Sequence, residues 1–462
     1  MHQVDVSSPF LDEISSRLPD LRLLTDPVDR ETHRRDETAY LETGLPAAVA
    51  LPTSTEEVAE LVRICAAHDV PIVPRGAGTG LSGGAAGIDG CLTIAFTRMD
   101  RILEIDRENL TVTTQPGIVN AKLKTAVAAE GLFYAPDPAS YESCTIGGNL
   151  GTNAGGLCCV KYGVTRDAVL GLEVVLADGT VLRLGGKNVK DVAGYGLIPL
   201  LVGSQGTLAL VTEATLRLRP APAPRSTLIA FFPTLESAGD AVAGLTKGGV
   251  APVTLELMDQ LTIKAVDDMQ SLGMDRDAAA MLLVESDLPG AAAAAELDGA
   301  QPICEGAGAT LVVRATDPQE ADWLRAGRRL AFRALEALGV ARMEDVGVPR
   351  SHIPEMLRAI ETIGQRHELV VGTFGHAGDG NLHPTFVLDR GDESAVERLY
   401  AAQHDLFEAA LALGGTVTGE HGIGVARKPW LVRQRGEDGV RVMRAIKQAL
   451  DPQGILNPGK ML

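Results

Sequence analysis

Prolines at alternating positions 220, 222 and 224 constrain the fold more than any other feature of this 462-residue chain. Proline fixes φ and has no backbone N–H, so this stretch cannot continue a helix or a central strand and is typical of a stiff connector. A chain of this length is also too long for one compact core, and two or three domains are expected. We therefore predict the main domain boundary here, between residues 46–222 and residues 223–418.

Short strands and helices alternate on both sides of this connector. Before it, apolar alternation predicts strands at residues 70–74, 91–96, 110–115, 172–176 and 181–184, the last two joined by an Asp-Gly turn. After it, we predict strands at 226–232, 253–258 and 281–285, and helices at 235–245 and from about Asp317 to Leu338. Residues 1–45 are predicted to form a separate N-terminal helical segment. After the connector, the repeated strand–helix–strand alternation favours a second domain of α/β layers.

Composition excludes several classes of partner. A formal charge of −18 argues against nucleic acid and anionic membrane surfaces. No apolar run approaches the roughly 18 residues of a transmembrane segment, and the N-terminus lacks the basic and apolar regions of a secretory signal. The six cysteines show no CxxC spacing, which is typical of reduced thiols and offers no iron–sulfur pattern. We expect a cytoplasmic protein, with peripheral attachment to a membrane through a partner as the alternative.

Three glycine-rich loops precede the connector. In the first, residues 74–84, glycines allow successive backbone N–H groups to converge on an anion. Its glycines match a dinucleotide-binding pattern, but a strand is predicted after them where that pattern needs a helix, and no P-loop lysine follows. The loop therefore predicts a diphosphate cradle without a helix. Further glycine-rich loops follow at residues 144–156 and 203–213.

Histidines and a carboxylate gather in two glycine-flanked stretches near the C-terminus. His376 and His383 lie in residues 375–384, and Glu420 and His421 are neighbours in residues 418–422. Two histidines and a carboxylate are ligands of divalent metals, and three protein ligands leave coordination positions open for a substrate. Histidine also titrates near neutrality, which suits a proton acceptor. These residues predict a catalytic metal centre; the alternative is a glycine-rich loop with solvated histidines.

The order of these motifs resembles that of the vanillyl-alcohol oxidase/p-cresol methylhydroxylase superfamily. Within it, the sequence is most similar to the group of glycolate oxidase flavin subunits and D-lactate dehydrogenases, with D-2-hydroxyglutarate dehydrogenases as nearby relatives. The resemblance covers nearly the whole chain from about residue 40. It implies an α+β fold with a two-subdomain FAD-binding domain at 46–222, an α/β substrate (cap) domain with an antiparallel sheet and the metal site at 223–418, and a C-terminal helical segment at 419–462 that returns to the flavin.

The resemblance also implies roles for individual residues. The FAD-binding residues would be Arg75, Gly76, Ala77, Gly78, Thr79, Gly80, Pro136, Asp137, Gly147, Gly148, Gly151, Thr152, Asn153, Gly155, Gly156, Val211, Glu213 and Asn457. The FAD should be bound non-covalently, because residues 74–85 hold neither the His nor the Cys that carries the flavin in some members. A divalent metal (zinc, manganese or iron) would be held by His376, His383 and Glu420. Arg328 would bind the substrate carboxylate, and His421 would take the hydroxyl proton.

Two departures from the hydroxyglutarate enzymes narrow the expected substrate. Met343 stands where they carry a lysine for the distal carboxylate, and Thr385 stands where they carry an asparagine. Burying an unpaired second carboxylate would be costly. We therefore predict an FAD-dependent dehydrogenase that oxidises a small (R)-2-hydroxy acid, D-lactate or glycolate. The alternatives are D-2-hydroxyglutarate as substrate, or direct oxidation by oxygen.

The remaining expectations concern partners. Electrons are expected to leave to an iron–sulfur subunit, a quinone, a cytochrome or an electron-transfer flavoprotein, and the chain is expected in a homodimer or a heteromeric complex. Two rival interpretations come from other functional classes: a flavoprotein subunit without catalytic activity, and a metal hydrolase without flavin. The first leaves the set of Arg328, histidines and Glu420 without a role, and the second leaves the three glycine loops unexplained.

Overall fold

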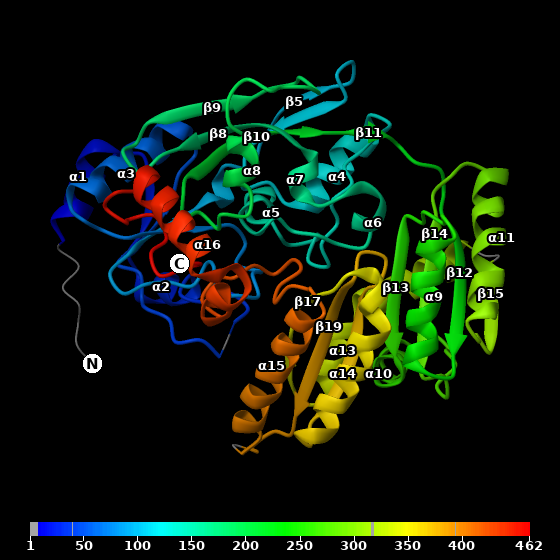
Figure 1. Cartoon of the computed structure of the whole chain (residues 1–462). Helices are drawn as coiled ribbons and strands as arrows, with labels where there is room; N and C mark the ends of the chain where they lie inside the picture. The colour runs from blue at the N-terminus through cyan, green and yellow to red at the C-terminus, as the bar shows by residue number, and fades with distance from the viewer. Residues whose placement is uncertain (1–7, 39, 316–317, 393) are drawn as a thin grey trace. The chain divides into compact units, whose positions relative to one another are not determined.

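The computed structural model describes residues 8–38, 40–315, 318–392 and 394–462, which fold into two compact units (Figure 1). The first unit contains the residues up to Gly155, 164–221 and 420–462; the second contains Gly156–Gly163 and Pro222–Gly419. The chain therefore passes between the units four times, and one passage lies inside the proline connector. None of the helices in the described residues is long and apolar enough to cross a membrane.

Two sheets form the first unit. The first sheet has the order β1 (Arg22–Leu24), β2 (Ala48–Leu51), β4 (Leu92–Ala95), β3 (Ile72–Arg75), and its last three strands are parallel. Helices α1 (Pro9–Arg17) and α3 (Thr55–Ala67) pack on each other beside it. Ser54 caps α3 by accepting a hydrogen bond from Glu57 N, while Glu57 accepts one from Thr53 N. Together these two bonds satisfy backbone N–H groups at the start of α3.

The second sheet is antiparallel, in the order β5 (Ile102–Asp106), β6 (Thr111–Thr114), β10 (Leu210–Arg217), β8 (Val169–Val175), β9 (Val181–Gly185). The predicted hairpin around Asp178-Gly179 is confirmed as β8 and β9. The two-residue strands β7 (Leu132–Phe133) and β11 (Arg219–Pro220) pair with each other. The other helices of this unit are α2 (Pro27–Thr32), η1 (Phe96–Arg98), α4 (Asn120–Ala129), α5 (Ile146–Thr152), α7 (Thr165–Ala168), α8 (Leu197–Leu201) and α16 (Lys428–Leu450).

One antiparallel sheet dominates the second unit, as expected. Its order is β15 (Leu311–Arg314), β12 (Ser226–Phe232), β14 (Ala280–Ser286), β13 (Thr254–Asp259), β18 (Val370–His376), β19 (Asn381–Leu388), β16 (Val340–Met343), with β17 (Val346–Gly347) also paired to β19. The helices are α6 (Cys159–Tyr162), α9 (Leu235–Lys247), α10 (Gln260–Gln270), α11 (Ala291–Gly306), α12 (Pro318–Arg329), α13 (Ala331–Leu338), η2 (Arg350–His352), α14 (Ile353–Arg366) and α15 (Ser394–Ala412).

Helices cover both faces of this sheet. Ile229 and Phe231 of β12 share one core cluster with residues of α10, α12 and α13. Because side chains alternate along a strand, their neighbours Leu228, Ala230 and Phe232, which are also buried, point to the opposite face. There α9 packs against α11 and α14. Strands covered on both faces lack polar alternation, which is why they appear in the sequence as nearly continuous apolar runs.

The single helix predicted from Asp317 to Leu338 is wrong in one respect, since the structure breaks it at Leu330; Asp317 itself lies outside the described residues. The amide of Leu330 is shared between the carbonyls of Ala326 and Gly327, which tightens the last turn of α12. Gly327 also weakens the helix, because glycine has a low helix propensity. A Cβ at Gly327 would lie 2.7 Å from Leu272 Cδ1, so the glycine allows a close approach that a helix former would prevent.

Candidate functional site

The first glycine loop starts where β3 ends, at Arg75, and packs without room for side chains. A Cβ at Gly76 would lie 2.3 Å from the hydroxyl of Thr145, and one at Gly78 would lie 2.1 Å from the guanidinium of Arg75. Arg75 is buried, and its Nη1 donates to the carbonyl of Ala85 across the loop. Burial lowers the pKa of Arg75, although the charge of Asp36 opposes the shift. A buried cation among closely packed backbone amides is suited to a diphosphate.

The second glycine-rich stretch is not a loop throughout, which corrects the expectation from the sequence. Residues 146–152 form the helix α5, which contains Gly147, Gly148, Gly151 and Thr152. Thr145 caps it by accepting a hydrogen bond from Gly148 N, and Asn153 ends it in the left-handed conformation. A Cβ at Gly147 would lie 2.7 Å from Pro116 Cβ, so glycine is required here by packing. Because Pro116 is distant in the sequence, no local pattern reveals this contact, and the glycines alone wrongly predicted a loop.

Gln205 and Asn457 join the loops of the first unit. The amide of Gln205 donates to the Ser82 hydroxyl, and the Gln205 backbone N donates to the carbonyl of Gly151. Asn457 donates from Nδ2 to the carbonyls of Gly84 and Gln205, at 2.9 and 2.7 Å. The predicted cofactor residues near Arg75, in α5 and at Asn457 are thus brought together. Gln205 was not singled out, although it lies inside the third glycine-rich loop.

Other predicted cofactor residues are placed by contacts of their own. Asn120 joins Pro136 to α5 by donating to the carbonyl of Pro136 and to the side chain of Asn149. Asp137 is buried. Val211 and Glu213 lie on β10, where they pair with Val174 and Glu173 of β8. Burial and the charge of Glu173 raise the pKa of Glu213. The chain leaves the first unit between Gly155 and Gly156.

The segment that carries His421 packs on the first glycine loop. The Ser82 hydroxyl donates to the carbonyl of His421 at 3.0 Å, and Gly424 N donates to the side chain of Gln205 at 2.8 Å. A Cβ at Gly424 would lie 2.0 Å from the carbonyl oxygen of Ser82, and its φ is +50°, so glycine is required there. The His421 side chain is mostly buried. His421 thus belongs to the unit that holds the glycine loops.

In the second unit, a hairpin places both predicted metal-binding histidines on one face. In the register of β18 and β19, Phe374 lies opposite His383 and His376 lies opposite Asn381. Directly opposed residues point to the same face, as do residues two positions apart. The rings of His376 and His383 therefore meet, with centroids 5.3 Å apart and an interplanar angle of 87°. The turn of four residues between the strands contains Gly380, with φ +83°.

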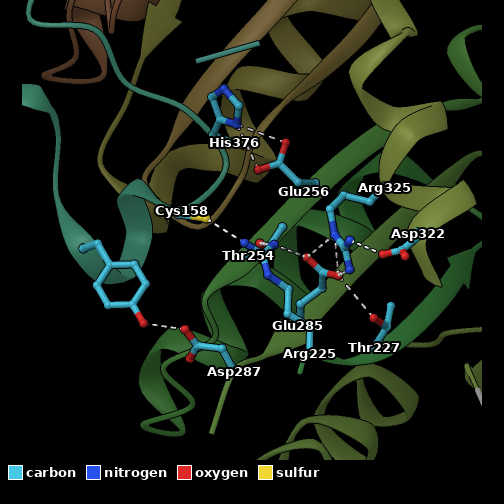
Figure 2. Close-up of polar contacts among 11 residues, drawn as sticks. Cys158, Arg225, Thr227, Thr254, Glu256, Glu285, Asp287, Asp322, Arg325 and His376 are labelled. Carbon is cyan, nitrogen blue, oxygen red and sulfur yellow. Dashed lines mark hydrogen bonds and ion pairs between the residues drawn. The ribbon is translucent and has the colours of Figure 1, made fainter. Parts of the chain in front are cut away.

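Glu256 and Arg328 complete this face. Glu256 lies on β13, where Leu257 pairs with Gly375, so the register continues to place Glu256 opposite His376. Its carboxylate oxygens lie 2.9 and 3.0 Å from His376 Nδ1 (Figure 2). Nη2 of Arg328, from α12, lies 2.6 Å from the same carboxylate, and Cζ of its guanidinium lies over the ring of Phe374, 4.8 Å from the centroid. All of these side chains are buried.

A second buried carboxylate, Asp345, faces the other histidine. Asp345 Oδ1 lies 3.8 Å from His383 Nδ1, and the carboxylate accepts hydrogen bonds from Asn381 Nδ2 and the Thr418 hydroxyl, both at 2.7 Å. Gly419, the next residue, packs so closely that a Cβ would lie 2.3 Å from Asn381 Nδ2. Glu420 follows Gly419 directly.

The two imidazoles fit a divalent metal. Rings at this separation can each direct one nitrogen at a common ion, because a zinc–nitrogen bond is about 2.0–2.1 Å long. Metal-binding histidines usually donate their other N–H to a carboxylate, and each of these histidines has a buried carboxylate on its Nδ1 side. The donor set of nitrogen and carboxylate oxygen suits zinc, manganese or iron.

Glu256 and Asp345 were not predicted as site residues. The sequence does contain a signal for Glu256, since a glutamate stands in the middle of the apolar strand Thr254–Asp259. A buried charge is costly unless it is paired, so such a residue indicates a partner elsewhere in the chain. The partner could not be identified, because His376 lies 120 positions away.

The same sheet face carries a second buried glutamate, Glu285 of β14, which forms ion pairs with Arg225 and Arg325 (Figure 2). Burial alone would raise the pKa of Glu285, but the hydrogen bond from Arg325 and the charges of Arg225 and Arg325 outweigh it and leave the pKa below its ordinary value. Arg225 Nη2 also lies 3.0 Å from Cys158 Sγ. Arg325 therefore pairs with Glu285, whereas Arg328 pairs with Glu256, the partner of His376.

Comparisons with protein families assign both halves of the chain. Residues 221–461 match the model of FAD linked oxidases, C-terminal domain, and residues 46–185 match the model of the FAD binding domain. These matches support FAD as the cofactor of the first unit's glycine loops.

Similar proteins align over most of their length. Glycolate oxidase subunit GlcD of Bacillus subtilis (strain 168) is 46% identical over 90% of this chain and 89% of its own. D-lactate dehydrogenase of Anaerostipes hadrus is 35% identical over 100% of this chain and 98% of its own. Among solved structures, p-cresol methylhydroxylase with bound substrate superposes with a TM-score of 0.81 at 17% identity, over 98% of this chain and 96% of that chain. This last likeness shows a shared fold.

Substitution of Gly76 by alanine tests whether the glycine packing holds the cofactor. The added Cβ would displace Thr145, the cap of α5, and we expect the purified variant to retain less than half of the FAD that the parent retains. Gly186→Ala is the matched control, because a Cβ there meets nothing within 4 Å. The flavin-to-protein absorbance ratio measures the outcome. Equal ratios in the parent and Gly76→Ala would contradict the assigned role.

Proposed function

Because this chain belongs to the FAD-linked oxidases of the vanillyl-alcohol oxidase/p-cresol methylhydroxylase superfamily, we propose that it oxidises a small (R)-2-hydroxy acid to the 2-oxo acid. The relatives named glycolate oxidase subunit and D-lactate dehydrogenase support this substrate class. The observation that carries the proposal is the face of the second unit on which the histidine pair His376 and His383 adjoins the buried Arg328.

A 2-hydroxy acid offers two groups to such a face. Its carboxylate can pair with the guanidinium of Arg328 through two parallel hydrogen bonds, which fixes the orientation of the substrate. Its hydroxyl oxygen can bind a divalent metal held by His376, His383 and Glu420, and a bound cation lowers the pKa of such a hydroxyl. We infer that Glu420 supplies the third ligand, because Gly419 beside Asn381 ties its backbone to this face.

The reaction then needs a proton acceptor and a hydride acceptor. We propose that His421 takes the hydroxyl proton, since a histidine can accept a proton near neutral pH. Bound FAD supplies the hydride acceptor. The substrate thereby loses one proton and one hydride and becomes the 2-oxo acid. The packing of His421 on the glycine loop at Ser82 supports a position beside the cofactor.

Met343 and Thr385 support a monocarboxylate substrate. They lie directly opposite each other on β16 and β19, so they share one face, and Thr385 is two positions from His383 on the same strand. Met343 and Phe332 both pack on the apolar cluster of this face. Arg342, the nearest alternative cation in sequence, alternates to the other face and lies 3.7 Å from Glu344. A distal carboxylate would thus meet an apolar wall.

We further propose that the electrons leave the flavin to a separate acceptor, either an iron–sulfur subunit, a quinone, a cytochrome or an electron-transfer flavoprotein. The name of the Bacillus relative, a subunit of glycolate oxidase, supports assembly with other chains. Use of oxygen as the direct acceptor is the alternative. A screen of D-lactate, glycolate and D-2-hydroxyglutarate with an artificial dye acceptor tests the substrate class.

Substitutions of His421 and Glu420 should have separable effects. His421→Ala should slow flavin reduction by roughly 10²–10⁴-fold, the usual effect of removing a general base. Its metal and FAD contents should stay near those of the parent, because His421 is not proposed as a ligand. Glu420→Ala should lose metal and activity together. Anaerobic stopped-flow bleaching of the flavin, with elemental analysis of each variant, measures both.

The two variants serve as controls for each other, since they alter neighbouring residues of one segment. Flavin reduction at the parental rate in His421→Ala would place the base elsewhere. Loss of metal from His421→Ala would show that the proposed division between ligand and base is wrong.

Substitution of Met343 by lysine should shift the substrate preference. A new charge-assisted hydrogen bond contributes about 1.5–3 kcal/mol, so kcat/KM for D-2-hydroxyglutarate relative to D-lactate should rise roughly 10–100-fold. Met343→Leu, which conserves volume and apolar character, should leave the ratio unchanged. A parent enzyme that already prefers D-2-hydroxyglutarate would overturn the proposed monocarboxylate specificity.

A further inference from the structure

We propose that Glu256 is a positioning residue that couples the metal ligand His376 to the carboxylate-binding Arg328. This inference rests on the proposed function and deepens it, because it assigns a role to a residue that lies between the two binding groups. One carboxylate contacts both partners: His376 Nδ1 at 2.9 Å and Arg328 Nη2 at 2.6 Å.

A positioning role would explain why a charged residue is buried at position 256. Glu256 is 1% exposed on a central strand, between the apolar residues Leu255 and Leu257. Burying a carboxylate is costly unless it is paired and hydrogen-bonded, and a protein with an apolar residue at such a position is often as stable or more stable. Arg328 and His376 supply that pairing. The charged network of Glu256, Arg328 and His376 is therefore better explained by the positioning of the two binding side chains than by a gain in the stability of the fold.

Towards His376, Glu256 selects the tautomer that can bind a metal. A carboxylate paired with arginine can only accept hydrogen bonds, so the hydrogen of a neutral His376 must be on Nδ1. The lone pair is then on Nε2, the nitrogen that points away from Glu256 and is suited to be the ligand. Carboxylate–histidine pairs of this kind also fix the ring orientation, and their loss typically weakens metal binding 10–100-fold.

Towards Arg328, Glu256 fixes the rotation of the guanidinium. Its Nη2 forms an ion pair with the carboxylate, while Cζ lies over the ring of Phe374, 4.8 Å from the centroid. The guanidinium fork is rigid, so holding it at one nitrogen and on one face sets the direction of its other N–H groups. A side chain ordered before the substrate binds loses less entropy on binding. Glu256 thus couples the orientation of two groups that bind different ends of one substrate.

Asp345 does not have the same role for the other histidine. It lies 3.8 Å from His383 Nδ1, beyond hydrogen-bond distance, while Asn381 and Thr418 donate to it at 2.7 Å. Its contacts hold the strand end and the segment before Glu420. Among these residues, Glu256 therefore has the shortest contact to a metal-binding histidine.

The test uses Glu256→Gln in the purified FAD-bound chain. The amide keeps the shape but can donate to Nδ1 and so place the hydrogen of His376 on the metal-binding nitrogen. After removal of metal by a chelator, titration with Zn²⁺ against a chelating indicator should show a 10–100-fold higher Kd than the parent. KM for D-lactate with a dye acceptor should also rise, because Arg328 loses its fixed orientation.

Glu285→Gln is the matched control. Glu285 is also a fully buried glutamate paired with arginines, on the adjacent strand, but within the described part of the chain it contacts no histidine. It should lower stability while leaving the Kd for Zn²⁺ and KM unchanged. If Glu256→Gln does not fold, Glu256→Asp keeps the charge but withdraws the carboxylate, and it should also weaken Zn²⁺ binding.

The outcomes separate this inference from the proposed function. A parent that binds no Zn²⁺ with its FAD in place would contradict the metal site itself. A parent that binds Zn²⁺, together with a folded Glu256→Gln (or Glu256→Asp) of equal Kd and KM, would overturn only the role of Glu256. Equal weakening in Glu285→Gln would also overturn it, since the effect would then come from general damage to the sheet.

Discussion

The antiparallel register that joins β13, β18 and β19 is the constraint on which the chemistry of the second unit depends. It sets Glu256 opposite His376, and Phe374 opposite His383, so that four side chains from three strands share one face. Because side chains alternate along a strand, a slip of one residue would turn both histidines to the opposite face of the sheet. The helices packed on both faces oppose such a slip, since it would also exchange the buried apolar residues.

In the first unit the main constraint is different, because several backbone loops must pack closely against one another. There, glycines at positions 76, 147 and 424 leave room for Thr145, Pro116 and Ser82, and the side-chain amides of Gln205 and Asn457 join the loops by hydrogen bonds. The second unit relies instead on buried charges, each matched by a partner. A rigid backbone cradle suits a large cofactor that remains bound, whereas paired charges on a sheet suit a small substrate that must be oriented and released.

The sequence predicted what local patterns encode. The β8–β9 hairpin and the pairing of His376 with His383 follow from turn residues and a glycine-flanked motif, and the loop near Arg75 was identified by its glycines. The antiparallel sheet of the second unit was instead implied by the resemblance to a known family. It did not predict contacts made over long separations. Glu256 is 120 residues from His376, α5 contains glycines because Pro116 packs against it, and the break at Leu330 depends on the fit of Gly327 against Leu272. These features are set by tertiary packing, which overrides local propensity.

The central claim is that the histidine face binds a divalent metal on which a 2-hydroxy acid is oriented. Anomalous X-ray diffraction from crystals of the FAD-bound chain grown with Zn²⁺, recorded on both sides of the zinc absorption edge, tests it most directly. The account predicts a peak about 2.0–2.1 Å from Nε2 of both His376 and His383, with Nδ1 of His376 still on Glu256. A zinc-containing crystal with no anomalous peak at these two imidazoles, or with zinc bound through Nδ1 of His376, would contradict it.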